Sequence, residues 1–232
     1  MTFTQFPLDD RVQRAIVAAG FQTPTPIQAA AIPVALAGGD LLGTAQTGTG
    51  KTAAFVLPLL QRLLATPAAG PRTRALILLP TRELAGQVHE AIRQLARFTK
   101  LRSATVYGGV GMAPQERALR EGAEMIVACP GRLLDHLQRG YVDLRALECL
   151  ILDEADRMLD MGFLPDIRRI VSQVPAARQT MLFAATFAPD LDRFAAQILR
   201  DPARVAVGTV APASTVEHTV YPVPAHLKMA LL

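Results

Sequence analysis

A stretch rich in glycine and threonine, from Ala45 to Thr52, has the residue types of a loop that binds phosphate. It reads Ala-Gln-Thr-Gly-Thr-Gly-Lys-Thr and departs from the G-x-x-x-x-G-K-[ST] pattern only in having Ala45 for the first glycine. Gly48 and Gly50 would let backbone N–H groups approach phosphate oxygens at a helix N-terminus. Lys51 would reach the β- and γ-phosphates, and the Thr52 hydroxyl would bind Mg²⁺. A turn with an incidental lysine is the alternative, but an apolar run before the loop and a helical pattern after it favour phosphate binding.

Three carboxylates, those of Asp153, Glu154 and Asp156, follow another apolar run. An Asp at a strand end near a phosphate loop can hold Mg²⁺ through water, and the adjacent Glu can position an attacking water. Acids in such a place are otherwise often a solvated turn or a helix cap. In combination with the phosphate loop, they predict a site that hydrolyses a nucleoside triphosphate, with Lys51, Asp153 and Glu154 as its catalytic residues.

The elements that must position these residues are visible as short apolar runs that alternate with amphipathic stretches. Helical spacing is clearest in Arg82–Phe98 and Asp190–Leu199. The apolar runs are 40–43, 75–79, 104–107, 123–128, 149–152, 180–184 and 204–207. Strands that are apolar on both sides predict an α/β fold, a parallel sheet with helices on both faces. Right-handed crossovers then bring every strand-to-helix loop to one edge of the sheet, where the phosphate loop and the acids would meet.

The composition is that of a folded protein, with 50% apolar and 19% charged residues. We find no secretory signal and no apolar run near the roughly 20 residues that a membrane helix needs, so we expect a cytoplasmic protein with no membrane partner. Cys129 and Cys149 are expected to be reduced, and neither they nor the 4 histidines have metal-ligand spacing. A net charge of +4 fits a polyanionic partner, although many metabolic enzymes are equally basic.

The tetrapeptide Asp-Glu-Ala-Asp at 153–156 spells the name of the DEAD-box RNA helicases, and the chain resembles that family in further motifs that occur in the family's order. These are Gly20–Gln28 (the Q motif, with Phe3 as its upstream aromatic), Pro80–Ala85 (motif Ia), Gly108–Gly109 (the GG motif), Pro130–Arg132 (motif Ib) and Ala184–Thr186 (motif III). The likeness runs from Phe3 to about residue 230. It implies the N-terminal RecA-like domain, a P-loop NTPase fold, of a superfamily 2 helicase.

For the nucleotide, the resemblance implies ATP with Mg²⁺. The amide of Gln28 can donate and accept at once, so it can read N7 and the exocyclic amine of adenine, and Phe21 would stack on the base. The sequence contains no Asn, which excludes the guanine-reading Asn-Lys-x-Asp motif. Thr52 and Asp153 would be the Mg²⁺ ligands, partly through water. The implied nucleotide contacts are Phe21, Thr23, Gln28, Ala45, Gln46, Thr47, Gly48, Thr49, Gly50, Lys51 and Thr52.

For RNA, the resemblance implies contacts to the sugar-phosphate backbone without sequence preference. Small residues, a hydroxyl and guanidinium groups suit such binding. The matching positions are Pro80, Thr81, Arg82, Gly109, Gly131 and Arg132. Without the family pattern, Arg82 could equally be an ordinary surface arginine, and Gly108 and Gly109 could be turn glycines.

Two positions depart from the family pattern. Motif III usually reads Ser-Ala-Thr, and Ala184 takes the place of the serine, which leaves Thr186 as the only hydroxyl there. In the family, this motif and Asp156 are thought to couple hydrolysis to strand separation. Motif Ib usually begins with Thr, and Cys129 takes that place. We therefore expect the coupling to be altered while ATP binding is retained.

Residues 1–208 are assigned to the RecA-like ATP-binding domain, with the Q motif in 1–28. An N-terminal helix is expected at Leu8–Ala19, stopped by Gly20. The interpretation of 209–232 is a linker at 210–214, a strand at 215–220 and a helix from 224, which together resemble the beginning of a second RecA-like domain. That second half would supply arginines for the γ-phosphate and complete the RNA groove.

The function expected from the sequence is ATP-dependent RNA helicase activity, in which RNA-stimulated ATP hydrolysis drives local unwinding. This chain would be the ATP- and RNA-binding half, with little or no activity by itself. One alternative is a clamp that binds ATP or RNA without hydrolysis, which Ala184 favours. Another is a different phosphate-loop enzyme, such as a small-molecule kinase or a DNA helicase, which Gln28 and Phe21 argue against.

Overall fold

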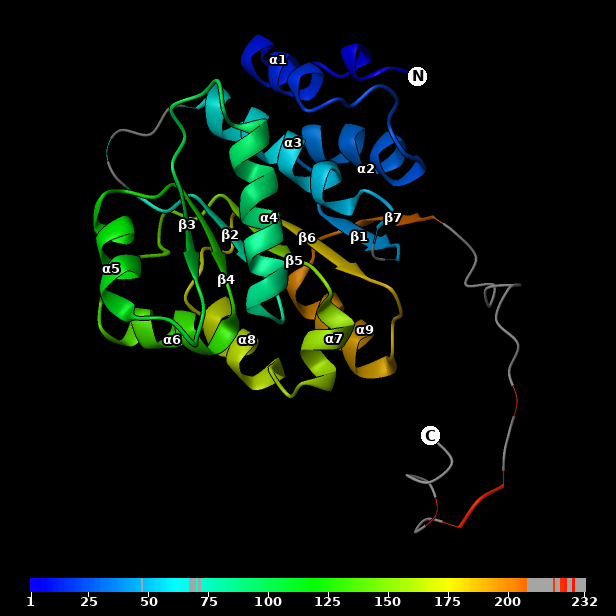
Figure 1. Ribbon diagram of the computed structural model, residues 1–232, viewed down its shortest axis with the longest axis vertical. Helices are drawn as coiled ribbons and strands as arrows, with labels where there is room; N and C mark the ends of the chain where they lie inside the picture. The colour runs from blue at the N-terminus through cyan, green and yellow to red at the C-terminus, as the bar shows by residue number, and fades with distance from the viewer. Residues whose placement is uncertain are drawn as a thin grey trace.

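The computed structural model describes residues 1–46, 48–66, 70, 72–207, 219, 222–224 and 227. Its core is one sheet of seven strands in the order β3-β4-β2-β5-β6-β1-β7, and all neighbouring strands are parallel (Figure 1). The strands are β1 (Leu41–Thr44), β2 (Ala75–Leu78), β3 (Ser103–Val106), β4 (Met125–Ala128), β5 (Cys149–Leu152), β6 (Gln179–Ala184) and β7 (Ala203–Ala206).

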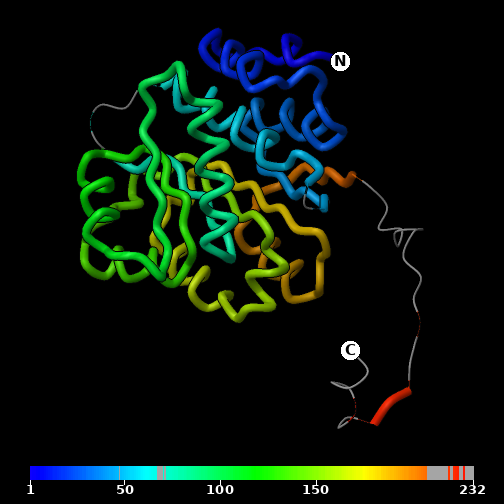
Figure 2. The backbone as a smooth tube through the Cα atoms, in the orientation of Figure 1, coloured from blue at the N-terminus to red at the C-terminus, as the bar shows by residue number. Residues whose placement is uncertain are grey.

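Helices cover both faces of this sheet, as the sequence predicts. One face carries α1 (Asp10–Ala18), α2 (Pro26–Leu36), α3 (Lys51–Ala65) and α4 (Arg82–Leu95). The other carries α6 (Pro130–Gln138), α7 (Ala155–Asp160), α8 (Leu164–Val171) and α9 (Pro189–Ile198), while α5 (Met112–Arg120) follows the edge strand β3. A short 3₁₀ helix, Phe3–Gln5, precedes α1, and the N-terminal segment lies across α3 and α4 (Figure 2).

Alternation along each strand explains why two cores form. In β2, Ala75 and Ile77 belong to the core under α1 to α4, whereas Leu76 and Leu78 belong to the core under α6 to α9. Successive side chains of a strand point to opposite faces, so a strand that is apolar at every position serves both cores.

The predicted element boundaries differ from the observed ones by a few residues. The N-terminal helix begins at Asp10 because the Asp9 side chain accepts a hydrogen bond from the backbone N–H of Arg11 at 2.9 Å and caps it. The helix predicted to reach Phe98 ends at Leu95. The linker, strand and helix predicted after 208 lie outside the described residues, apart from a few isolated positions.

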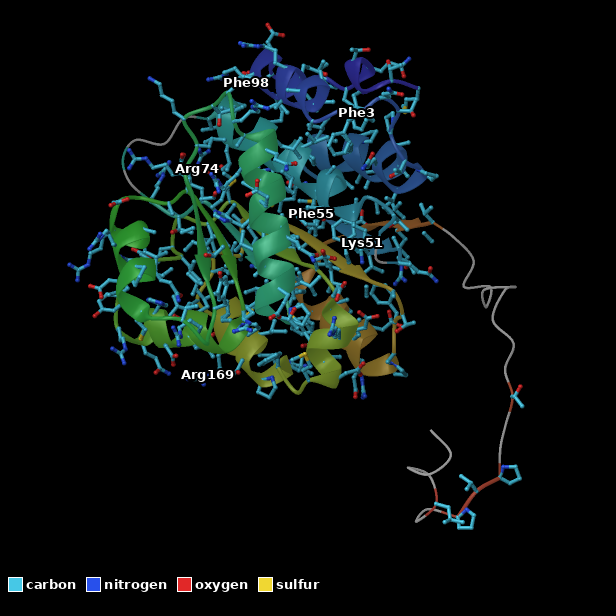
Figure 3. The ribbon with its side chains drawn as sticks, viewed as in Figure 1. Phe3, Lys51, Phe55, Arg74, Phe98 and Arg169 are labelled. Atoms are coloured by element: carbon cyan, nitrogen blue, oxygen red, sulfur yellow. The ribbon has the colours of Figure 1, made fainter. Side chains whose placement is uncertain are left out.

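A buried ion-pair cluster joins three strands at the amino edge of the sheet (Figure 3 labels Arg74). Arg74, Glu124 and Glu148 each directly precede a strand, β2, β4 and β5 respectively, and β2 lies between the other two. The Arg74 guanidinium, fully buried, donates to Glu148 at 2.6 and 3.2 Å, to Glu124 at 3.3 Å and to the backbone carbonyl of Leu63 at 3.0 Å. The cluster therefore fixes the starts of these strands against the end of α3.

Within the described residues, no helix is long and apolar enough to cross a membrane. Cys149 lies buried in β5, Cys129 is half-buried directly after β4, and both are free thiols.

Candidate active site at the carboxyl edge of the sheet

The loops that follow six of the strands contain the residues that the sequence singled out. Because all neighbouring strands are parallel, the loops after β1, β2, β3, β4, β5 and β6 all leave from the carboxyl edge. They carry, in that order, the phosphate loop, Arg82, Gly109, Arg132, Glu154 and Thr186. The fold thus brings these predicted site residues to one edge of the molecule. The Q motif, which precedes β1 in the chain, is added to them.

The phosphate loop has the backbone that its glycines predict. Gly48 and Gly50 have φ values of 85° and 92°, in the left-handed region that favours glycine. Gly50 is the N-cap of α3, so Lys51 and Thr52 form the first turn of that helix. The Thr49 hydroxyl donates to the backbone carbonyl of Gln46 at 2.8 Å and closes the loop on itself. Thr47 lies outside the described residues, and Ala45 is buried at the loop entrance.

Lys51 and Asp153 form a buried pair of opposite charges across β6. The Nζ of Lys51 lies 3.6 Å from Oδ1 of Asp153, and the two side chains are 6% and 7% exposed. Burial raises the pKa of the Asp153 carboxyl above its ordinary value, and the attraction of Lys51 opposes this effect. Further positive charge brought to this carboxylate would stabilise its ionised form. The pair therefore has the properties of a cation-binding and phosphate-binding position.

Glu154 has an unusual backbone conformation. Its φ of 54° and ψ of 47° lie in the left-handed region, which is uncommon outside glycine and carries strain. It is the N-cap of α7, and its backbone N–H donates to Oδ1 of Asp153 at 3.0 Å. Its carboxylate is 3.5 Å from Nη1 of Arg157, one turn along α7. Glu154 is therefore bonded through its backbone to Asp153 and paired through its side chain with α7.

Gln28 connects the Q motif to the phosphate loop. Its Oε1 accepts from the backbone N–H of Thr25 at 2.9 Å, and its Nε2 donates to the backbone carbonyl of Gly50 at 3.0 Å. The side chain is 1% exposed. The Thr-x-x-Gln pattern that begins α2 is a capping-box pattern and could have revealed the first of these bonds. The second joins residues 22 positions apart and has no local signal.

The two aromatic residues of the Q motif region pack against each other. Phe21 is half-buried, and its ring makes an edge-to-face contact with the buried ring of Phe3, with centroids 5.7 Å apart. Thr23, the other predicted nucleotide contact in this segment, is exposed.

Motif III is bound to the acidic tetrapeptide through Asp156. One carboxylate oxygen, Oδ2, accepts from the backbone N–H groups of Ala185 and Thr186 at 3.0 and 2.9 Å and from the Thr186 hydroxyl at 3.2 Å. Ala184 has a buried methyl group, and its carbonyl accepts from the backbone N–H of Ala45 at 3.1 Å. Motif III therefore contacts both the acids and the phosphate-loop entrance without a serine hydroxyl.

Arg82 lies on the surface beside the GG motif. Pro80 is buried at the end of β2, and Thr81 caps α4 by accepting from the backbone N–H of Leu84 at 3.4 Å. Arg82 is 59% exposed, and its Nε lies 2.6 Å from Oε1 of Glu83. Gly109 has a φ of 79°, and a Cβ at this position would lie 3.1 Å from Nη1 of Arg82. Arg82 and Gly109, which the sequence predicts as RNA contacts, are therefore neighbours.

Arg132 links motif Ib to the same loop. Its Nη1 donates to the backbone carbonyl of Val110 at 3.0 Å, and its Nε is 3.5 Å from Asp135. Gly131 lies in the first turn of α6, where a Cβ would meet nothing within 4 Å. Burial raises the pKa of the Cys129 thiol to about 11, so this residue at the start of α6 stays protonated at neutral pH.

Two charged residues of this edge were not singled out in the sequence. Glu83 pairs with Arg82, and Arg157 pairs with Glu154. Glu83 lies within motif Ia and Arg157 directly follows the acidic tetrapeptide, but each carries an ordinary surface charge that does not distinguish it from solvated helix residues.

Comparison with known proteins identifies the chain's relatives. The family model "DEAD/DEAH box helicase" matches residues 25–194. The chain is 48% identical over 205 residues to DEAD-box ATP-dependent RNA helicase 28 of Oryza sativa subsp. japonica, covering 88% of this chain and 26% of that protein. It is 47% identical to ATP-dependent RNA helicase DeaD of Mycobacterium tuberculosis, covering 88% of this chain and 36% of that protein.

A solved structure agrees with this likeness. The crystal structure of a DEAD box protein from the hyperthermophile Methanococcus jannaschii superimposes with a TM-score of 0.83 at 37% identity, covering 89% of this chain and 56% of that one. The chain thus spans about a quarter to a third of the length of the curated relatives named above. The predicted fold, a RecA-like parallel sheet with helices on both faces, is confirmed. The chain belongs to the DEAD/DEAH box helicase family.

Proposed function

We propose that this chain binds ATP, Mg²⁺ and RNA as the nucleotide-binding half of an RNA-stimulated ATPase that separates short RNA duplexes locally. The observation that carries the proposal is the buried pair of Lys51 and Asp153, 3.6 Å apart, at the start of a glycine-capped helix with Glu154 adjacent. A cation and a carboxylate held in this way suit a triphosphate and its metal ion.

The binding step uses groups already in position. The ammonium of Lys51 would donate to the β- and γ-phosphates, and the backbone N–H groups at the start of α3 would face the same anion. Asp153 and the Thr52 hydroxyl are hard oxygen ligands, and Mg²⁺ typically takes one or two protein oxygens besides phosphates and water. When bound, Mg²⁺ would neutralise charge that develops on the phosphates.

Glu154 would orient the attacking water. It follows Asp153 directly and begins α7, beside the residue that would hold Mg²⁺. Its backbone N–H is bonded to Asp153, which fixes the position of Glu154 relative to the Mg²⁺ ligand.

Adenine recognition would use the remaining hydrogen-bonding capacity of Gln28. An amide has two N–H donors and two acceptor lone pairs. One donor goes to Gly50 and one lone pair to Thr25. The donor and the lone pair that remain match N7 and the exocyclic amine of adenine. Because the same side chain bonds the phosphate loop, recognition of the base would be transmitted to the loop that holds the phosphates.

RNA would bind along Arg82, Gly109 and Arg132, with Thr81 and Gly131 beside them and the buried Pro80 supporting the start of α4. Guanidinium groups next to glycines favour contacts with the phosphate and sugar backbone over contacts with base edges. We therefore propose binding without sequence preference.

The test is Glu154→Gln in the longest natural form of the protein, with Glu90→Gln on the exposed face of α4 as the matched control. ATP affinity should be retained within about twofold, while RNA-stimulated turnover should fall by about 10²-fold or more because the attacking water is no longer activated. The control should behave as the wild type. Undiminished turnover by Glu154→Gln contradicts the role of Glu154.

A non-hydrolysing clamp is the second candidate, and Ala184 favours it because motif III has no serine hydroxyl. Wild-type protein that binds ATP and RNA but does not turn over would support the clamp. Ala184→Ser would then be expected to restore turnover, whereas turnover by the wild type shows that Ala184 is tolerated.

A further inference from the structure

We propose that Gln115, a buried residue of α5, is a positioning residue that shapes the GG loop (residues 108–111) for RNA binding. Its side-chain amide holds this loop in the conformation in which Gly109 lies beside Arg82. The inference rests on the proposed function, since it assumes that RNA contacts Arg82, Gly109 and Arg132. It adds a residue that does not touch RNA and that orders the loop before RNA arrives.

The GG loop is rich in glycine and open to solvent. Residues 108–111 read Gly-Gly-Val-Gly, and all four are exposed. Glycine loses more conformational freedom on folding than any other residue, and exposed residues gain little order from packing. Gly109 nevertheless has a defined place, with a φ of 79° and a Cβ position 3.1 Å from Nη1 of Arg82. Hydrogen bonds from neighbouring side chains are therefore important for the shape of this loop.

Two side chains supply such hydrogen bonds. Nε2 of Gln115 donates to the backbone carbonyl of Tyr107 at 3.1 Å and to that of Gly111 at 3.3 Å, so one amide joins the residue before the loop to its last residue. Nη1 of Arg132 donates to the carbonyl of Val110 at 3.0 Å. Arg132 is itself a proposed RNA contact. Gln115 is only 7% exposed, so RNA does not compete for its hydrogen bonds.

The amide of Gln115 serves here as a donor. Its Oε1 is buried and has no hydrogen-bond partner among the described residues. An apolar side chain would avoid burying this acceptor, so the two donations are what the amide contributes to the structure. A substitution that keeps the shape of the side chain and removes only the N–H donors therefore tests the role of Gln115.

The place of the loop in the sheet explains why its shape matters. β3 is the edge strand, and β4 lies between β3 and β2 (Figure 1). Gly109 follows β3 and Arg82 follows β2, so the two residues meet across the end of β4. Neighbouring strands are about 4.8 Å apart, which separates β3 from β2 by roughly 10 Å. Because α5 packs against β3, Gln115 ties the loop to the edge from which it starts.

A loop that is ordered before RNA arrives favours binding. Without the donors of Gln115, the GG loop would sample other conformations in the free protein, and only the fraction with the productive one would bind RNA. The bound state would keep the same phosphate contacts. The loss should therefore appear in the affinity for RNA and leave turnover at saturating RNA unchanged.

Gln179 provides a matched control at the opposite edge of the sheet. Its Nε2 also donates to two backbone carbonyls, those of Ala35 at 2.9 Å and Gly39 at 2.8 Å, and the residue is 3% exposed. It begins β6 at the amino edge, away from the proposed RNA contacts. Substitution of either glutamine by methionine removes two donations and leaves an unbranched side chain of similar length.

The experiment measures the Kd of a short fluorescein-labelled single-stranded RNA for the longest natural form of the protein, with a non-hydrolysable ATP analogue present. Gln115→Met should raise this Kd about three- to tenfold, the loss expected for a hydrogen bond of ordinary strength. Gln115→Glu, which keeps the length but has no N–H donor when ionised, should raise it at least as much. ATP affinity and turnover at saturating RNA should stay within about twofold of the wild type in both variants. Gln179→Met should lower the melting temperature but leave the RNA Kd unchanged.

The salt dependence of the Kd separates positioning from direct contact. The slope of log Kd against log salt reports the number of phosphates neutralised in the complex. Gln115→Met should keep the wild-type slope, because its bound state has the same phosphate contacts. Arg82→Gln, which removes a cation, should lower the slope by about 0.7 to 0.9.

Three results overturn the inference while leaving the proposed function intact. The first is a wild-type RNA Kd in Gln115→Met. The second is an equal weakening by Gln179→Met, because it means that lost stability lowers the affinity. The third is a fall in turnover of Gln115→Met at saturating RNA, because the bound state is then altered. Wild-type affinity and slope in Arg82→Gln would instead contradict the proposed RNA surface, and the inference would fail with it.

Discussion

The two edges of the sheet each hold a buried cation beside carboxylates, but they satisfy it differently. At the amino edge, Arg74 donates four hydrogen bonds to Glu148, Glu124 and a backbone carbonyl, the shortest at 2.6 Å. At the carboxyl edge, Lys51 lies 3.6 Å from Asp153, its one ion-pair partner among the described residues, and burial raises the pKa of that carboxyl. The guanidinium at the amino edge makes four hydrogen bonds within the protein, whereas the ammonium at the carboxyl edge, with three N–H donors, is available to a ligand.

This difference separates a charge that organises the fold from a charge that serves a function. A bidentate arginine holds neighbouring strands in one geometry. A lysine with three rotatable donors, at the start of a helix, suits an anion that arrives and leaves. Substitutions at the two edges should therefore change different observables.

The largest effect on stability is expected for Arg74→Met. Loss of the guanidinium leaves two carboxylates and a carbonyl without their shared donor, which should lower the free energy of unfolding by about 3–5 kcal/mol. Urea denaturation measures this loss. ATP affinity, measured at a temperature where the variant is folded, should stay within about twofold of the wild type. A variant as stable as the wild type contradicts the structural role of Arg74.

Lys51→Met should show the converse pattern. Loss of hydrogen bonds from a charged donor to the phosphates costs about 1.5–3 kcal/mol, or roughly 10- to 150-fold in ATP affinity. Stability should change by only about 1 kcal/mol, because Asp153 can take up a proton when its partner is lost. Calorimetric titration with ATP and urea denaturation of the same preparation measure the two quantities. Equal losses of ATP affinity and of the free energy of unfolding would mean that Lys51 has a structural role like that of Arg74.

Gly50→Ala and Gly48→Ala form a matched pair within the phosphate loop. Both residues have positive φ, so an alanine at either costs about 1–2 kcal/mol in backbone strain. At Gly48 a Cβ would meet nothing within 4 Å, whereas at Gly50 it would lie 2.5 Å from Nε2 of Gln28. Gly50→Ala should therefore destabilise the protein more and weaken ATP binding more. Indistinguishable variants in thermal unfolding argue against the contact between Gln28 and the loop.

Asp153→Asn should have the smallest effect on stability and should change its dependence on pH. Burial raises the pKa of Asp153 in the folded protein above its unfolded value of about 3.9, so its ionisation destabilises the fold. The stability contributed by the protonated form is present below about pH 4 and is lost as pH rises through the folded pKa. The variant should therefore gain stability relative to the wild type over this range, and urea denaturation at several pH values measures the gain. A difference that stays constant with pH contradicts the raised pKa.

The fold could be predicted from the sequence because its strands are apolar at every position. The run at 149–152 coincides with β5, and the run at 75–79 contains β2 with one further residue. Helix ends were less predictable. The apolar pattern of α4 continues past Leu95, and the chain turns at Ala96, where the Thr99 hydroxyl donates to the Ala96 carbonyl at 2.7 Å.

The motif-bearing loops could be placed at one edge because parallel strands leave no other arrangement. The side-chain contacts between residues far apart in the chain could not be predicted. Gln28 with Gly50 and Arg74 with Glu148 join residues 22 and 74 positions apart, and no local pattern encodes either pairing. An arginine before an apolar strand also has the sequence pattern of a surface residue, although Arg74 is the largest fully buried side chain among the described residues.

Competition binding tests most directly whether the carboxyl edge is an ATP site. A fluorescent ATP analogue bound to the chain would be displaced by ATP or by GTP, in the wild type, Lys51→Met and Arg74→Met. We predict that ATP displaces it at least about tenfold more effectively than GTP, that Lys51→Met binds roughly 10- to 150-fold more weakly and that folded Arg74→Met retains binding. Equal displacement by GTP, or wild-type affinity in Lys51→Met, would contradict the account.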